Sequence, residues 1–263
     1  MLTTPELAKP LVPSLAPYLE DLESRIDPVV EARLLAEWIA FQEGRFKGPI
    51  FHPRRPAPAP PRIPWPARPR INQTLDTPLN MALYELLSCS DALGAGNGAI
   101  LNVRANYSTG ILPSTLGARI FIMDDAHNTL PTTWPLDGGA NGIRAMLKRG
   151  VPPANTGLGE RVLTMGREFV DLFKDYPRIR RWVTIYHPDL QSPMDVTEML
   201  WGSNLFIDLL DVPDLAKACL EHVTATYAAL MRAWMAIVPF RPDYNAHWGI
   251  LLRGAIMLRD DSG

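Results

Sequence analysis

The chain has 263 residues, of which 47% are hydrophobic and 21% charged, and its formal net charge is −2. This composition is typical of a soluble globular protein and gives no reason to expect nucleic acid or a membrane as a partner. No apolar stretch is long enough to span a bilayer, no signal peptide is recognisable, and the two cysteines are far apart, so we expect a cytoplasmic protein without disulfides.

Two helices are predicted near the N-terminus. Residues 27–44 begin with an aspartate that can cap a helix, followed by a proline at the first helical position. Residues 76–94 repeat this signature, with Asp76 or Thr77 as the cap. We therefore expect residues 1–97 to form a helical N-terminal region.

Proline is unusually frequent, with 26 residues in the chain, about twice the average share of roughly 5%. Nine of these prolines lie in the segment 49–70, which cannot form a helix or a central strand. We expect an extended, polyproline-like connector. The connector is also locally basic, through Arg54, Arg55, Arg62, Arg68 and Arg70. We interpret it as a surface arm that wraps the domain, with a docking segment or a substrate-covering arm as the alternative.

Strand candidates alternate with predicted helices in residues 98–263. The four candidates are 99–105, 118–124, 181–187 and 254–260. The helices between them include residues 158–173 and 213–237, whose apolar residues recur with helical spacing. Such alternation predicts parallel pairing with right-handed crossovers, as in a doubly wound sheet or a (β/α)₈ barrel. A glycine cluster at 94–98 precedes the first strand, which indicates a helix-to-strand turn instead of a dinucleotide-binding loop.

Polar side chains crowd the exit of the third strand candidate, namely His187, Asp189, Gln191 and Ser192. Because α/β enzymes bind substrates at the carboxyl ends of parallel strands, we expect His187 and Asp189 to be catalytic. Gln191 and Ser192 are expected to bind substrate, and the dipole of the helix that follows suits a carboxylate or phosphate. The alternative for Ser192 is that it only completes the helix with Asp195, as a variant capping box. No third metal ligand accompanies His187 and Asp189 in sequence, so no metal site is predicted.

The ends of the other strand candidates carry further candidates. Tyr107 and Asp124 are expected to be catalytic. Tyr107 would donate a hydrogen bond or a proton, and the carboxylate of Asp124 would accept and release a proton. Arg104 can hold a carboxylate in two-pronged fashion. Each aspartate has an alternative role as a loop cap or as the partner of a neighbouring arginine. The remaining substrate-binding candidates are Asn106, Arg259 and Asp260. We expect one concavity to gather His187, Asp189, Arg104, Asp124 and Arg259.

Three segments resemble the uroporphyrinogen decarboxylase superfamily. They are NYSTGILPSTLGARIFIMD at 106–124, QSPMDVTEMLWG at 191–202 and DVPDLAKACLEHVTATY at 211–227. The resemblance extends over roughly residues 100–261 and implies a (β/α)₈ barrel. The family includes haem-pathway decarboxylases and corrinoid-dependent methyltransferases. The arginine-rich N-terminal motif of the decarboxylases has no counterpart here, and the metal ligands of the methyltransferases belong to the later half of the barrel.

The resemblance implies an enzyme that decarboxylates a carboxylated tetrapyrrole or a similar small molecule without a metal or organic cofactor. One alternative is a corrinoid-dependent methyltransferase, with a corrinoid protein as partner and zinc only if a further C-terminal part supplies its ligands. Another alternative is a non-catalytic binding protein derived from the same barrel. A homodimer is left open.

The chain length predicts an incomplete barrel. A full (β/α)₈ barrel takes about 250 residues, whereas residues 98–263 suffice for about four βα units of roughly 30 to 40 residues each. We therefore expect a curved parallel sheet with an open edge, and a chain that is inactive alone or needs a partner.

Overall fold

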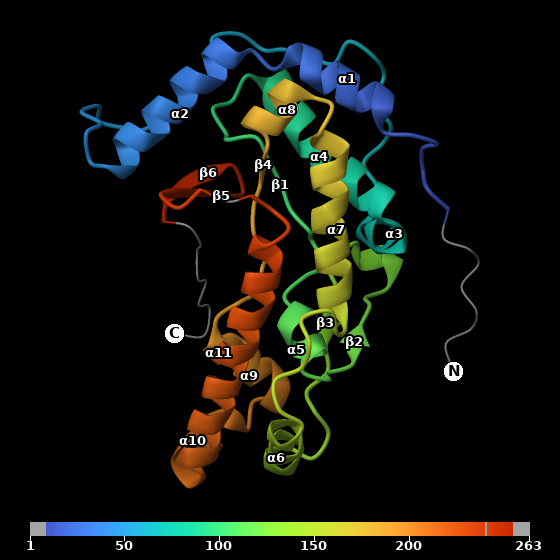
Figure 1. Ribbon diagram of the computed structural model, residues 1–263, viewed down its shortest axis with the longest axis vertical. Helices are drawn as coiled ribbons and strands as arrows, with labels where there is room; N and C mark the ends of the chain where they lie inside the picture. Colours follow the sequence, from blue (N-terminus) through green and yellow to red (C-terminus); the bar gives the residue numbers. More distant parts are fainter. Residues whose placement is uncertain (1–8, 240, 255–263) are drawn as a thin grey trace. The chain divides into compact units, whose positions relative to one another are not determined.

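The computed structural model describes residues 9–239 and 241–254 (Figure 1). The described residues form two compact units. Unit 1 comprises residues 9–104, 168–186 and 241–254, and unit 2 comprises residues 105–167 and 187–239. The last strand candidate, apart from its first residue, lies outside the described residues, as do Arg259 and Asp260.

Unit 1 begins with the predicted helical region. Its helices are α1 (Ala16–Arg25), α2 (Pro28–Gln42), α3 (Ile71–Asp76) and α4 (Pro78–Ala95). Asp27 caps α2 by accepting hydrogen bonds from two amides of its first turn, and Thr77 caps α4 by accepting one from Asn80. Gly96 ends α4 in the left-handed conformation, with φ of 62°. Both predicted helix starts and the glycine turn are confirmed; α1 and the short α3 were not anticipated individually.

The proline-rich connector contains no helix and no strand, apart from an isolated bridge between Arg54 and Asn97. The predicted lack of regular secondary structure in this segment is confirmed. Side chains of unit 1 hold it along its length: Arg25 Nε donates to Ala59 O at 2.9 Å, and the amide of Arg62 donates to Asp21 Oδ1 at 2.8 Å. The indole of Trp65 donates to the second oxygen of the same aspartate at 2.9 Å.

The first and third strand candidates pair in parallel, as predicted, but each contains only two strand residues. β1 (Asn102–Val103) and β4 (Thr184–Ile185) are neighbours in unit 1 (Figure 1). The amide of the next residue, Arg104, donates to Glu85 Oε2 at 3.1 Å. The predicted start of the third strand at residue 181 is wrong, because α8 (Pro177–Trp182) begins at a proline and occupies that segment.

Unit 1 also contains an antiparallel hairpin that the sequence did not predict. β5 (Tyr244–His247) pairs with β6 (Ile250–Arg253) across a turn formed by Trp248 and Gly249. Both turn residues have positive φ, 48° and 80°, as two-residue hairpin turns require.

Unit 2 is mainly helical. Its elements are α5 (Ile111–Thr115), β2 (Ile120–Phe121), the short 3-10 helix η1 (Asp125–His127), β3 (Thr132–Thr133), α6 (Ala140–Lys148), α9 (Pro193–Trp201), α10 (Leu205–Asp211) and α11 (Pro213–Met235). Helix α7 (Leu158–Phe173) starts in unit 2 and continues into unit 1. α11 packs against α5, α6, α9 and α10, and its buried residues recur with helical spacing, including Cys219, Val223 and Leu230.

Parallel pairing of the second strand candidate is a wrong prediction. β2 instead pairs antiparallel with β3, with Ile120 opposite Thr133. Strands of parallel sheets are normally covered on both faces, whereas Ile120 and Ile122 are 41% and 55% exposed. This segment is a surface ribbon.

The fold is therefore a mixture of helices and short strands, and its described residues contain three two-stranded sheets and no closed barrel. Among the same residues, no helix is both long and apolar enough to cross a membrane.

Candidate functional site

Two loops of unit 2 carry most of the predicted site residues. The loop 105–110 follows β1 and leads into α5, and the loop 187–192 follows β4 and leads into α9. α5 packs against α9. Ser108 and Gln191, one in each loop, have positive φ of 75° and 42°. Non-glycine residues rarely adopt such angles, and those that do cluster at functional sites.

His187 is buried, with 7% of its surface exposed. Its Nδ1 lies 2.8 Å from the carbonyl oxygen of Pro188. Because a carbonyl oxygen can only accept, a neutral His187 carries its proton on Nδ1 and has its acceptor lone pair at Nε2. The neighbouring Asp189 is half-buried and accepts a hydrogen bond of 2.9 Å from Gln191 Nε2. The contact with Pro188 O thus orients the His187 ring, and Gln191 orients the Asp189 carboxylate.

Ser192 and Asp195 form the capping box of α9. Ser192 Oγ accepts from the amide of Asp195 at 3.2 Å, and Asp195 Oδ2 accepts from the amide of Ser192 at 3.3 Å. Gly202 ends the same helix. The structure thus supports the alternative reading of Ser192, in which it completes the helix; its role in substrate binding stays a prediction.

The loop after β1 contains Asn106 and Tyr107, which are both buried, with 7% and 3% of their surfaces exposed. In the described part of the chain, Asn106 Oδ1 has no hydrogen-bond partner, and neither has Thr133 Oγ1 of β3. A Cβ added at Gly110 would lie 3.0 Å from Thr133 Cγ2, so β3 is close to this loop. Buried polar atoms of this kind normally bind an ordered water or a ligand. Nothing in the sequence singled out Thr133, because its place beside Gly110 depends on the fold.

Asp124 does not lie among these side chains. It is exposed and caps η1 by accepting a 2.8 Å hydrogen bond from the amide of Ala126. Within the described part of the chain, no hydrogen bond or ion pair connects it to either loop. The alternative reading, a loop cap, describes its observed contact.

Arg104 is a residue of unit 1, where it is surrounded by aromatic rings. It is 8% exposed, and its guanidinium carbon lies 5.9 Å from the ring centre of Tyr186 and 5.7 Å from that of Trp248. The His247 ring lies 5.4 Å from Tyr186 and 4.7 Å from Trp248. Cation–π contacts of this kind hold a guanidinium in place. The sequence analysis did not single out Glu85, His247 or Trp248. Trp248 has a local signal, because it forms a Trp-Gly pair at the hairpin turn. That Arg104 and His187 line the same concavity remains a prediction.

The described residues do not provide a zinc site. They contain no group of three His, Cys, Asp or Glu side chains suited to hold a metal. Burial raises the pKa of the Cys89 thiol to about 12 and that of the Cys219 thiol to about 11. Because zinc binds the thiolate, neither helix-borne cysteine is suited to it.

Comparison with known proteins shows similarity of fold alone. No protein-family model and no curated protein sequence matches the chain. A solved structure, a methyltransferase from Methanosarcina mazei, superimposes with a TM-score of 0.50 at 15% sequence identity. The superposition covers 78% of this chain and 56% of that one, so the chain spans little more than half the length of its structural neighbour. Over most of its residues, the chain shares the fold of a methyltransferase.

Proposed function

We propose that this chain belongs to a barrel-type methyltransferase of the uroporphyrinogen decarboxylase superfamily, which moves a methyl group between a corrinoid on a partner protein and a small acceptor. The likeness in fold to a methyltransferase carries this proposal. The parallel pairing of β1 with β4, joined by a long crossover, supports it because βα barrels are built from such pairs. The likeness favours methyl transfer over the decarboxylation expected first from the sequence.

In this proposal the two loops of unit 2 bind and orient the acceptor. Asn106 Oδ1 accepts a hydrogen bond from it, which would satisfy a buried atom that otherwise has no partner in the described structure. His187 exchanges the acceptor's proton at Nε2, since Nδ1 is held by Pro188 O. Tyr107 donates a hydrogen bond, and Gln191 holds Asp189 in place. The corrinoid of the partner would supply or take up the methyl group; no step is assigned to zinc.

The proposal is tested by titrating the full chain with methylcobalamin and, separately, with coproporphyrin, a carboxylated tetrapyrrole. Binding is followed by quenching of tryptophan fluorescence. We expect saturable binding of methylcobalamin that His187→Ala leaves unchanged, and transfer of its methyl group to an added thiol that His187→Ala slows by roughly a hundredfold, the size of a lost general acid or base. His127→Ala is the matched control, because His127 is an exposed histidine of unit 2 outside both loops. Saturable binding of coproporphyrin without binding of methylcobalamin would overturn the proposal in favour of the decarboxylase reading.

A further inference from the structure

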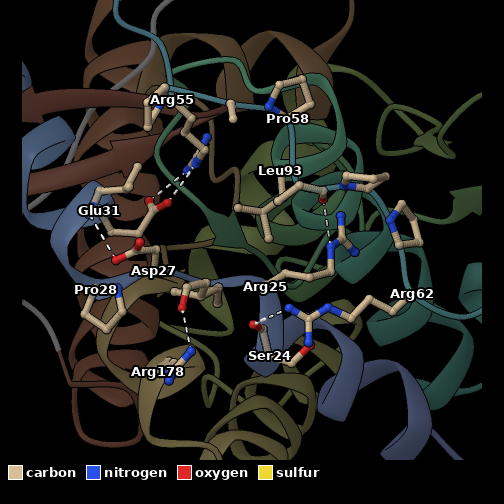
Figure 2. A pocket seen from close by; sticks show the side chains of 17 residues that line it. Ser24, Arg25, Asp27, Pro28, Glu31, Arg55, Pro58, Arg62, Leu93 and Arg178 are labelled. Carbon is tan, nitrogen blue, oxygen red and sulfur yellow. Dashed lines mark hydrogen bonds and ion pairs between the residues drawn. The ribbon is translucent and has the colours of Figure 1, made fainter.

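Unit 1 contains an open groove of about 730 Å³ that has no part in the proposed methyl transfer (Figure 2). The turn between α1 and α2 forms one wall, and connector residues 55–62 form the other. Leu93 of α4 and Arg178 of α8 complete the lining. Pockets that bind small molecules commonly have volumes of about 300 to 1,000 Å³, so this groove is large enough for such a ligand.

Two of the four arginines in the groove are structural. Arg25 forms a buried ion pair with Asp21 at 2.9 Å and also donates to Ser90 Oγ at 2.8 Å. Arg55 donates to both oxygens of Glu31 at 2.7 Å, in two-pronged fashion. These charges are neutralised inside the protein. The Arg55–Glu31 pair also fixes the connector against α2, and hydrogen bonds from Arg25 to Ala59 O and from the Arg62 amide to Asp21 fix it against α1.

The other two arginines differ. Arg62 and Arg178 are exposed, and in the described part of the chain neither has a carboxylate within ion-pair distance. Each guanidinium donates instead to a main-chain carbonyl, in the last turn of α1 for Arg62 and directly after α1 for Arg178. Arg62 Nη2 lies 3.4 Å from Ser24 O, and Arg178 Nη1 lies 3.1 Å from Ile26 O (Figure 2). The two carbonyls belong to residues two positions apart, so both guanidinium charges lie beside the same short stretch of the groove's rim.

The carboxylates of the lining do not neutralise these charges. Glu31 is paired with Arg55, and Asp27 Oδ1 accepts the amide of Val29 at 2.8 Å as the cap of α2. With Arg25 paired to Asp21 and Arg55 paired to Glu31, the charges left in the lining are those of Arg62 and Arg178 against that of Asp27, which is a surplus of one positive charge before ligand binding.

The wall formed by the connector is mainly apolar. After Arg55 it consists of Pro56, Pro58, Pro60 and Pro61, with alanines between the first three prolines. Proline rings fix the backbone φ, so this apolar wall loses little conformational freedom when a ligand binds. The groove therefore combines a rigid apolar wall with a cationic rim.

We propose that this groove binds a small organic anion, with its apolar body against the proline wall and its carboxylate or phosphate at Arg62 and Arg178. Guanidinium groups suit both anions, since their planar forks match the paired oxygens. The groove shares no residue with the loops of unit 2, so this proposal does not depend on the proposed methyl transfer.

The test uses the full chain and the fluorescent probe 1-anilinonaphthalene-8-sulfonate, which joins an apolar body to an anionic group. Its uncharged analogue N-phenyl-1-naphthylamine measures the contribution of the wall alone. Arg62→Ala and Arg178→Ala should each weaken binding of the anionic probe by about two- to fivefold, as expected for partly exposed charges. Neither change should alter binding of the neutral analogue. Competition by inorganic phosphate or by benzoate then distinguishes the two anion classes.

Arg180→Ala provides the matched control, because Arg180 is an exposed arginine of the same helix that does not line the groove. Arg178→Lys retains the charge but not the planar fork and should weaken binding of the anionic probe less than Arg178→Ala does. Circular dichroism verifies that every variant is folded. Equal weakening by Arg180→Ala would overturn the proposal, because it would reduce the effect to net charge. Absence of saturable binding to the wild-type chain would do the same.

Discussion

The buried ion pair between Arg55 and Glu31 should be the main attachment of the connector to α2. The side chains are only 3% and 5% exposed, and the guanidinium also donates to the carbonyls of Asn97 and Ala99. Arg55→Met keeps most of the stem but leaves a buried carboxylate and two carbonyls without their donor. Breaking one side of a buried pair costs about 3 to 5 kcal/mol. With a urea m-value of about 2 kcal/mol/M, the unfolding midpoint should fall by roughly 2 M.

Urea unfolding, monitored by circular dichroism, measures this effect. Arg33→Met is the control on α2. Its ion pair with Glu37 is 49% and 38% exposed, and its 2.8 Å hydrogen bond to the connector carbonyl of Arg54 is also exposed, so each contact should contribute at most about 1 kcal/mol. The double variant Arg55→Met/Glu31→Leu removes both charges and should recover much of the loss, because apolar replacements of buried pairs are often close to neutral. The reasoning is refuted if Arg55→Met costs no more than Arg33→Met, or if the double variant is no more stable than Arg55→Met.

Three further outcomes are expected. Ser192→Ala removes the cap that accepts the Asp195 amide and should destabilise the protein by about 1 kcal/mol in urea unfolding; an unchanged midpoint would show that the capping box contributes nothing. Burial alone would raise the pKa of Asp21, but hydrogen bonds from an indole, a main-chain amide and an arginine outweigh it and hold this pKa below its usual value of 3.8. A lowered pKa stabilises the folded state above the unfolded pKa, and this contribution disappears as the pH falls through the folded pKa. Wild-type stability should therefore fall more steeply below about pH 4 than that of Asp21→Asn in urea melts at several pH values, and parallel profiles would contradict this. The thiols of Cys89 and Cys219 are buried and have raised pKa values, so an aromatic disulfide reagent should label them only on unfolding; rapid labelling of the folded chain would count against the described core.

Helix starts were predictable because their chemistry is local. Asp27, Thr77 and Ser192 each stand directly before a proline-started helix, and each caps it through amides at most three residues away. The extended connector followed equally well from the constraints on proline.

Strand pairing was less predictable because it depends on distant residues. The apolar segment at 118–124 has the composition of a core strand, yet its partner is the nearby β3 and its isoleucines face solvent. The surroundings of Arg104 show the same limit. Glu85 lies 19 positions before it and Trp248 lies on a hairpin far along the chain, so only the fold brings these groups together.

The discontinuous course of the chain through its two units has a consequence for biosynthesis. The chain changes unit after residues 104, 167, 186 and 239. β1 therefore emerges from the ribosome without its neighbour, because Thr184 is made about 80 residues later, which takes roughly 4 to 16 s at common elongation rates. The strands of the hairpin at 244–253 arrive later still. Unit 1 can mature only after most of unit 2 has been translated, and a nascent chain stalled between these points would expose Leu101 and Val103, which are fully buried once folding is complete.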